Sequence, residues 1–461
     1  MKRSLLAICI LTILLVTGYT ANAYNGDIYI FLLFSATSNF LLLFGFRGKA
    51  FFFDTFIGVF LWIAFWLKLV LGIAVVGSSI AGISESVTVL DDSLLVSSVA
   101  FLALIIASYL KEFILYKNHH VNDKGNGAMF FLYKEHRKYI LIFYVLLFVF
   151  IAVTNSIFHI YQKGIVTPPG VSSVANVYKL LLLFGLSSFG ALILRYELDL
   201  KSKTTFFAPL LVIVEAFFTN VSLLSRAFIM NIASLGFGFL KHLQLNKIKL
   251  KLNFLIVITF VGLVAFIGSV LVVNSLRLQV SDGNSLTVTE HAESISNLVL
   301  NRLVGLEGVV AVSRHPGIGF ELFSASLDEK YDEHSMSFYD KNFIDSPYTG
   351  LYERIKGNNN INHYSSLPGF IAFFYYSGSM CFVFLMTFVF GFIAVFIEWL
   401  AYNLSSRNVI FSSLIAQTIA YRYIHFGYAP LNSYKLFGAI IFTIFSLYII
   451  EKVLGCWYKN V

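Results

Sequence analysis

Long apolar runs, separated by short polar stretches, follow one another along most of the chain. Eleven of these runs approach or exceed the roughly 20 residues that an α-helix needs to cross the hydrocarbon core of a membrane. They cover residues 27–46, 52–76, 94–115, 139–158, 176–194, 205–220, 222–240, 253–275, 367–397, 408–424 and 434–452. With one further helix at the N-terminus, the pattern predicts an all-α polytopic membrane protein with about 12 transmembrane helices.

The first 23 residues fit two descriptions. The sequence MKR, an apolar run to Val16 and then the sequence ANA have the order of a signal peptide with a small-residue cleavage site. The same residues also have the length and hydropathy of a first spanning helix. The helix is favoured because another spanning run follows immediately. Cleavage after residue 23 stays open.

One long polar stretch, residues 276–366, interrupts the apolar pattern. Apolar residues at helical spacing predict a helix over 291–313, which the sequence PGIG at 316–319 ends. Long polar segments in compact proteins are usually functional. We therefore expect this loop to lie over the outer mouth of a helical bundle. The chain divides into an N-terminal transmembrane bundle (1–275, about nine helices), the large loop with short helices (276–366) and a C-terminal group (367–461, about three helices).

Composition and charge placement support the membrane class. The chain is 58% hydrophobic and only 13% charged, whereas soluble domains usually carry about 25% charged residues. Its net charge of +8 is not spread evenly, because 20 of the 33 Lys and Arg lie in segments that face one side in the predicted topology. This positive-inside bias places both termini in the cytoplasm and argues against nucleic-acid binding.

No metal or nucleotide motif is visible in the sequence. The three cysteines lie in or near apolar runs, and no Cys/His spacing suits zinc. No Walker motif or glycine-rich strand–helix turn is present. We expect no cofactor and no metal, so the energy for any group transfer must arrive in the substrate.

Four arginines are the candidate ligands for an anionic substrate. Arg226 and Arg422 lie at the outer ends of predicted spans, where a charged residue is a default functional candidate. Arg302 and Arg314 flank Glu307 in the polar loop. Guanidinium groups pair phosphate oxygens bidentately and stay charged, which suits a diphosphate. Snorkelling at the membrane interface and a local salt bridge to Glu307 remain alternatives.

Glycosyl transfer from a lipid-linked diphosphate also needs a general base. His363, just before the chain re-enters the membrane, is the first candidate, and Glu307 and His315 follow. Further residues near the same surface are candidates for contacts with sugar or phosphate, although interfacial packing is the simpler reading of the aromatic ones. They are Arg354, Tyr364, Tyr376 and His425.

Three stretches of sequence together resemble a known family. They are NRLVGLEGV at 301–309, NHYSSLPG at 362–369 with YYSG at 375–378, and AYRY at 420–423 with FGY at 426–428. Over about 295–435 the chain resembles bacterial oligosaccharide repeat-unit polymerases, the Wzy-type O-antigen polymerases. The first half is similar only in hydropathy and topology.

The resemblance implies a GT-C-like inner-membrane glycosyltransferase without metal or nucleotide sugar. It implies transfer of a growing glycan from undecaprenyl pyrophosphate onto the next lipid-linked repeat unit in the periplasm. It assigns pyrophosphate binding to Arg226, Arg302, Arg314 and Arg422. By analogy with O-antigen ligases it makes His363 the base. A Wzz-type chain-length co-polymerase is the implied partner.

Two other functions compete with polymerisation. An O-antigen ligase would use the same kind of bundle and donor with a different acceptor, and residue types barely separate it from a polymerase. A polysaccharide flippase or other transporter would favour charges at mid-membrane and internal symmetry of two halves. Here the polar residues gather at one face and no repeat is visible, so a polymerase is the preferred hypothesis.

Overall fold

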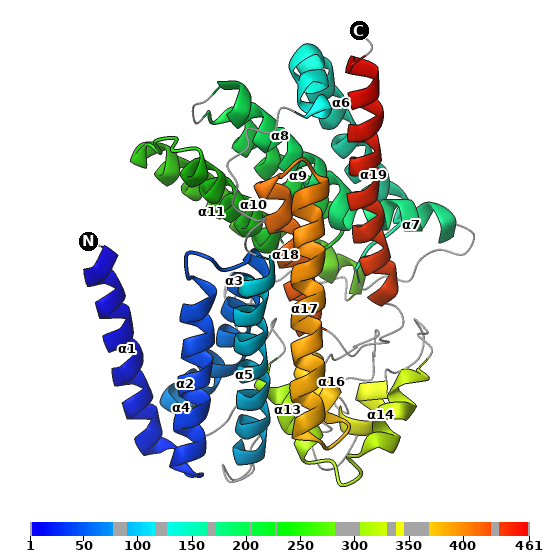
Figure 1. The fold of residues 1–461 in the computed structure, drawn as a ribbon. Coiled ribbons are helices and arrows are strands. Elements are labelled where there is room, and N and C mark those ends of the chain that lie inside the picture. The colour runs from blue at the N-terminus through cyan, green and yellow to red at the C-terminus, as the bar shows by residue number, and fades with distance from the viewer. Residues whose placement is uncertain are drawn as a thin grey trace. The chain divides into compact units, whose positions relative to one another are not determined.

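The computed structural model describes residues 2–76, 90–115, 127–163, 172–201, 205–225, 228–281, 305–329, 338–344, 368–425 and 433–459. Every regular element in these ranges is a helix (Figure 1), as the sequence predicts. Three short segments are π-helices: η1 (Trp62–Leu67), η4 (Leu181–Gly185) and η5 (Asp340–Ile344).

The chain forms two compact units, each assembled from separate parts of the sequence. Unit 1 contains residues 1–116, 298–395 and 419–434, and unit 2 contains 117–297, 396–418 and 435–461. The division falls within α17 (Met380–Leu404) and α18 (Val409–Ile424), each of which contributes to both units. The division into bundle, loop and C-terminal group is a division of the sequence, and it stays a prediction.

Unit 1 is built around the packing of α2 against α5. The first helices are α1 (Lys2–Ala23), α2 (Ile28–Gly45), α3 (Phe52–Leu61), α4 (Lys68–Val76) and α5 (Leu90–Leu115). Helix α2 also packs on α3, and η1 continues α3 into α4 (Figure 1). The polar loop adds α13 (Leu306–Ser313) and α14 (Phe320–Leu327), and α16 (Phe370–Tyr375) follows. Because α13 packs on α5 near its start, we call this end the loop end, and the end at Leu115 the far end.

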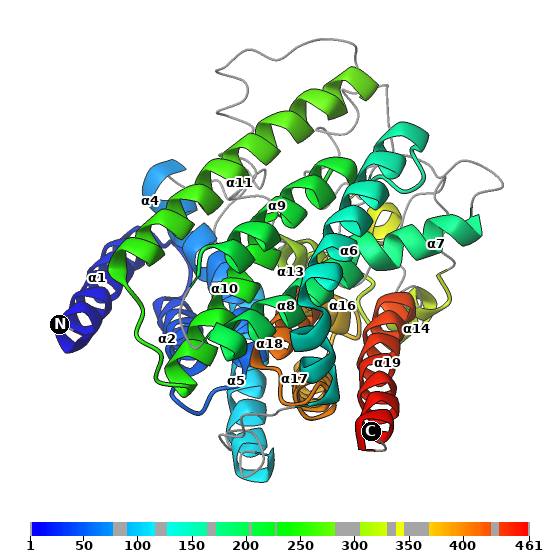
Figure 2. The ribbon, with the colours of Figure 1, turned by 90° about the horizontal axis from the view of Figure 1, so that it is seen from above.

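Unit 2 surrounds α9. Its helices are α6 (Ala128–Phe158), α7 (Ser172–Leu180), α8 (Leu186–Lys201), α9 (Phe207–Ser222), α10 (Phe228–Leu245), α11 (Leu252–Ser281) and α19 (Ser433–Lys459). Helices α6, α8, α10 and α11 all contact α9, and Figure 2 shows them from above. Apolar residues on both sides of α9 make this central position favourable.

Eight helices in the described ranges are long and apolar enough to cross a membrane. They are 28–45, 52–73, 90–114, 128–158, 173–201, 252–276, 380–404 and 436–457, and shorter apolar helices cover 10–23, 207–222 and 409–424. Few residues of the apolar windows in α11 and α19 are buried within the protein (17% and 11%), which suits contact with lipid. The chain is thus a polytopic helical membrane protein, and its count of about 12 spans stays a prediction.

The run at 367–397, predicted as a single span, is not one continuous helix. It contains α16 and α17, separated by a turn at Tyr376–Ser379. Gly378 has φ +68°, a left-handed conformation that glycine adopts without a steric penalty. Hydropathy does not distinguish such a break from a continuous helix, because the flanking residues are apolar on both sides.

Candidate functional site

Two glycines allow the loop helix α13 to touch the backbone of segments far away in sequence. A Cβ atom at Gly305 would collide with the carbonyl oxygen of Ala64 in η1. A Cβ atom at Gly308 would collide with the carbonyl oxygen of Pro368. Any larger residue at either position would push α13 away, so these glycines are required for close approach.

A third glycine brings in the end of α18. Gly369 has φ +80°, and a Cβ built on it would lie 3.0 Å from the carbonyl oxygen of Ile424. Arg422 lies in the last turn of α18, and His425 follows Ile424. Gly369 is next in sequence to Pro368, which contacts α13. The three stretches that carry the family resemblance therefore meet at the loop end of unit 1.

Glu307, in the first turn of α13, forms an ion pair with Lys68 at the start of α4. Lys68 Nζ donates to Glu307 Oε1 at 2.5 Å, and Lys68 is 8% exposed. Glu307 Oε2 is buried and accepts no hydrogen bond from the described residues. A carboxylate oxygen in this state has capacity for a proton or for a hydrogen bond from substrate.

Sequence reasoning missed Lys68, although a signal was present. It is the one charged residue after Asp54 in the apolar run 52–76. A lysine inside a predicted span is costly and has a partner or a function in most cases. That signal singles out Lys68 but does not identify Glu307 as its partner.

Arg314 follows α13 as its C-cap residue. Its backbone N–H donates to the carbonyl of Val310 at 3.3 Å. The neighbouring Ser313 hydroxyl lies 2.8 Å from the Ser93 hydroxyl on α5, which fixes the end of α13. A cation at a helix C-terminus interacts favourably with the helix dipole, and Arg422 in the last turn of α18 has the same advantage. These positions contribute to helix stability whether or not a ligand binds.

His315 is held by a hydrogen bond and by an aromatic ring. Its Nδ1 accepts from the backbone N–H of Gly317 at 3.1 Å, and its ring centroid lies 5.0 Å from that of Phe343. Burial lowers the pKa of His315 below its ordinary value. In the neutral tautomer that this bond selects, Nε2 carries the hydrogen, so His315 is better placed to donate a hydrogen bond than to accept a proton.

His425 is in the opposite tautomer. Its Nδ1 lies 3.0 Å from the carbonyl oxygen of Tyr421, which can only accept, so Nδ1 donates. Its ring packs on Tyr421, with centroids 4.3 Å apart. In the neutral imidazole the lone pair then resides on Nε2, so His425 can accept a hydrogen bond there.

Tyr376 packs inside unit 1. It is fully buried, and its ring stacks on Phe343 with centroids 4.9 Å apart. Its carbonyl accepts from Gly319 N–H at 2.8 Å, which ties α16 to the loop. The ring shows no exposed face for a sugar in this structure, and its predicted contact with substrate stays untested.

Five predicted site residues lie outside the described residues: Arg226, Arg302, Arg354, His363 and Tyr364. Of the remainder, Glu307, Arg314, Tyr376, Arg422 and His425 all belong to unit 1. Within the described ranges no group of three or more His, Cys, Asp or Glu has the arrangement of a metal site. A small cavity in unit 1 has apolar or backbone walls and suits no charged ligand; its lining residues are Leu61, Phe65, Pro368, Gly369, Phe370, Ile371 and Ile424.

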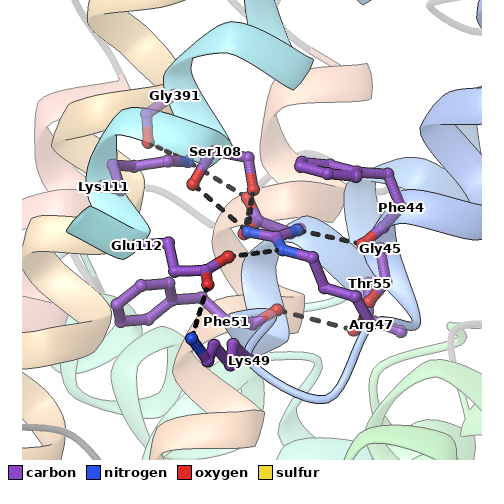
Figure 3. Close-up of polar contacts among 11 residues, drawn as sticks. Phe44, Gly45, Arg47, Lys49, Phe51, Thr55, Ser108, Lys111, Glu112 and Gly391 are labelled. Carbon is purple, nitrogen blue, oxygen red and sulfur yellow. Dashed lines mark hydrogen bonds and ion pairs between the residues drawn. The ribbon is translucent and has the colours of Figure 1, made fainter. Parts of the chain in front are cut away.

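The far end of unit 1 holds a second charged cluster (Figure 3). Arg47 Nε donates to Glu112 Oε2 at 2.9 Å, and Lys49 lies 3.5 Å from the other oxygen of Glu112. Lys111 Nζ donates to Asp54 Oδ1 at 3.0 Å and is fully buried. Opposite charges at these distances interact strongly in a buried setting.

Neutral groups complete this far-end cluster. The Ser108 hydroxyl donates to Asp54 Oδ2 and lies 2.9 Å from an Arg47 nitrogen. Lys111 also donates to the carbonyl oxygen of Gly391 on α17 at 3.2 Å (Figure 3). All four carboxylate oxygens of Asp54 and Glu112 are engaged, so the cluster joins α2, α3, α5 and α17 and leaves no acceptor over for a ligand.

Comparison of the chain with protein-family models, with curated proteins and with solved structures finds no match. The class of protein therefore follows from the structure alone: a polytopic helical membrane protein with a polar site at one end of unit 1.

Proposed function

We propose that this protein is an O-antigen polymerase of the Wzy type. It transfers the growing glycan from undecaprenyl pyrophosphate onto the next lipid-linked repeat unit, at the periplasmic face of the inner membrane. The observation that carries the proposal is the close contact of three segments at the loop end, which Gly308 makes with Pro368 and Gly369 makes with Ile424. These glycines stand in the same stretches that resemble the polymerase family.

The proposed reaction is a single displacement. The acceptor hydroxyl oxygen attacks the anomeric carbon of the donor glycan, and the bond from that carbon to the pyrophosphate oxygen breaks with inversion. The hydroxyl proton passes to a base. Among the described residues Glu307 is the proposed base. Lys68 holds one of its carboxylate oxygens, and Oε2 can accept the proton. His363 remains the first candidate from sequence.

The leaving group carries the negative charge that develops. Arg314 and Arg422 are the described residues proposed to stabilise it, with Arg226 and Arg302 proposed from sequence. Guanidinium groups suit both phosphates of the carrier. The energy for transfer resides in the donor bond, so the reaction as proposed uses no cofactor. A Wzz-type co-polymerase is the proposed partner that sets chain length.

The test is a gene deletion in the native host, with the surface lipopolysaccharide separated by size. Complementation uses wild type, Glu307→Gln, His363→Ala and the control Glu321→Gln, which alters an exposed glutamate in the same loop. Membrane insertion of each variant is checked by quantifying the protein in isolated membranes. Gln at position 307 keeps an oxygen that accepts from Lys68, so the fold is retained while the base is lost.

Loss of the polymer ladder with retention of core plus one repeat unit supports the polymerase. Among the variants, loss of the base lowers the rate about 10²- to 10⁴-fold, and Glu321→Gln restores a full ladder. Carrier-linked long chains that never reach the surface would instead identify a ligase. Repeat units trapped on the cytoplasmic side would identify a transporter, and an undiminished ladder in the deletion strain contradicts all three.

A further inference from the structure

A carboxyl group is buried at the centre of unit 2. Glu215 lies in the middle of α9, the helix that α6, α8, α10 and α11 all contact (Figure 2). Its side chain is fully buried. It is also the one charged residue in the sequence stretch 204–225. An ionisable group inside an apolar helix is costly, and it has a partner or a function in most cases.

The partners of Glu215 are few in the part of the chain that the structure describes. The hydroxyl of Thr219, one turn further along α9, donates to Oε1 at 2.8 Å. The other oxygen, Oε2, is buried and has no hydrogen-bond partner among these residues. None of their basic side chains forms an ion pair with Glu215. The carboxyl group of Glu307 is different, because Lys68 pairs with one of its oxygens.

The helices around α9 bring a phenol, but no countercharge, to this carboxyl group within the described ranges. Tyr144 on α6 is fully buried and close enough to Glu215 for an electrostatic interaction, and its hydroxyl donates to the carbonyl oxygen of Leu186 at 3.3 Å. Helix α11 carries no charged residue before Arg277. The charged residues of α6, α8 and α10 pair with one another: Arg137 with Glu197, and Arg195 and His242 with Asp199.

These surroundings favour the neutral form of the Glu215 carboxyl group. Burial without a cation penalises an ionised carboxylate far more than a neutral carboxylic acid. In the neutral acid, Oε1 is the carbonyl oxygen that accepts from Thr219, and Oε2 carries the proton. The geometry of the site therefore suits a bound proton.

A track of polar groups connects Glu215 with the surface beyond the end of α9. The hydroxyl of Ser222 donates to the carbonyl oxygen of Thr219 at 3.2 Å. Gln162, in the turn after α6, donates to the carbonyl oxygen of Ser222 at 3.4 Å and accepts from His159 Nδ1 at 2.8 Å. Thr219, Ser222 and Gln162 are buried, whereas His159 is exposed. The track therefore runs from the buried carboxyl group to an imidazole at the surface.

We propose that Glu215 is a proton-binding site, occupied at neutral pH, and that its proton exchanges with solvent along the track from His159 to Thr219. On binding, a carboxylate oxygen takes up a proton that comes from water at the surface, and on release the proton returns to water. Imidazole and hydroxyl groups both accept and donate protons, as in the proton relays of membrane proteins. The site does not depend on the proposed polymerase activity, since Glu215 belongs to unit 2 and Glu307 to unit 1.

The test is infrared spectroscopy of the purified full-length chain in neutral detergent. A protonated carboxyl group has a carbonyl stretching band that an ionised carboxylate lacks. We expect this band in wild type at neutral pH and its loss in Glu215→Gln, where the amide keeps the shape of the neutral acid. The control Glu321→Gln alters an exposed glutamate and leaves the band unchanged.

Thr219→Val tests the assignment without changing the carboxyl group itself. It removes the hydroxyl that donates to Oε1, so the band moves to higher frequency. In heavy water the band also shifts as deuterium replaces the proton, and we expect this exchange to be several-fold slower in Thr219→Val than in wild type. The control Thr154→Val removes a hydroxyl on α6 outside the track and changes neither the frequency nor the exchange rate.

Absence of the band from folded wild type at neutral pH overturns the proposal, and this outcome needs no variant. A band that persists in full in Glu215→Gln belongs to another carboxyl group and overturns the proposal as well. If Glu215→Gln does not fold, an unchanged band frequency in Thr219→Val has the same meaning. Equal exchange rates in Thr219→Val and wild type overturn the track as the route of the proton. A failed ladder assay leaves all these outcomes unaffected.

Discussion

The two charged regions of unit 1 differ in how completely their carboxylates are used. At the far end, Asp54 and Glu112 share their four oxygens among Arg47, Lys49, Lys111 and Ser108. At the loop end, Glu307 engages Lys68 through Oε1, and Oε2 accepts no hydrogen bond from the described residues. Native structures rarely leave a buried polar atom in that state without a reason.

The difference separates a structural role from a functional one. A saturated cluster has nothing to offer a substrate, and its value is the positioning of four helices. A buried carboxylate with one oxygen that accepts no hydrogen bond lowers the stability of the fold, but that oxygen can still accept a proton or a hydrogen bond from a substrate. Charge within a predicted span is thus not by itself evidence of a site. The number of carboxylate oxygens that can still accept a hydrogen bond or a proton is more informative about a functional site than the presence of charge.

The largest expected effect comes from breaking the saturated cluster. Asp54→Asn removes the countercharge of Lys111, which is fully buried. Leaving a buried ammonium group without its carboxylate costs about 3–5 kcal/mol. We expect little folded protein in detergent by fluorescence-detected size-exclusion chromatography, and a strongly lowered melting temperature for what remains.

The control for this prediction is Lys49→Ala, which removes the exposed member of the same cluster. Its side chain is 57% exposed, and its pair with Glu112 is worth about 0–1 kcal/mol. Wild-type yield and melting temperature are expected. If Asp54→Asn were as stable as Lys49→Ala, the far-end cluster would not be structural and the comparison would fail.

A smaller effect is expected from moving the loop-end site without touching its charges. In Gly308→Ala the added methyl group meets the carbonyl oxygen of Pro368 and displaces α13, at a cost of about 1–3 kcal/mol. A shift of about 1 Å in a catalytic group can reduce a rate about 100-fold. We therefore expect shortened polymer ladders from protein that still inserts in the membrane.

Gly319→Ala is the matched control, because no atom lies within 4 Å of a Cβ at that position and φ is 171°, an extended conformation that alanine adopts. It should leave both the ladder and the melting temperature unchanged. Shortening of the ladder by both glycine variants alike would show that the close approach at Gly308 has no special role.

The smallest effect concerns the pH dependence of stability at the loop end. Burial lowers the pKa of His315 below its ordinary value near 6.5, so between the two values the unfolded chain binds more protons than the folded one. The stability that His315 contributes is present above about pH 6.5 and is lost as the pH falls through the lowered pKa. The melting temperature of wild type should therefore fall more than that of His315→Gln on acidification below pH 6.5. Parallel curves for the two proteins would contradict the role given to burial.

Much of the fold follows from the sequence, because the apolar period of a membrane helix is a local property. Each of the eleven predicted runs contains helix in the structure, and their ends differ by a few residues at most termini. Of the helix predicted over 291–313, the end is confirmed, because α13 ends at Ser313 before the PGIG sequence. The helix does not run through Gly305, whose φ of −146° and ψ of −123° are not helical, and residues 291–304 lie outside the described residues. The break at Gly378 was missed, because a left-handed glycine inside an apolar run leaves hydropathy unchanged.

The candidate site was predictable in part. Arg422 stood out because a charged residue at the end of a span is costly and rare. Glu307 and Arg314 stood out as charged neighbours in the polar loop. Lys68 satisfies the rule about charged residues in spans but was missed. Its partner lies 239 residues away, and no spacing predicts such a contact. The opposite tautomers of His315 and His425 likewise depend on which backbone groups lie beside each ring.

The sequence by itself determined the class of this protein. Apolar runs without water-compatible polar faces fold as membrane helices wherever they occur, and the placement of basic residues orients them. The tertiary structure alone decided which charges are neutralised and which keep an acceptor. That outcome depends on contacts between distant segments, such as α13 against η1 at Gly305 and against Pro368 at Gly308. A single methyl group at either glycine would prevent the contact. The pattern of hydrophobic residues does not reveal where two backbones approach so closely.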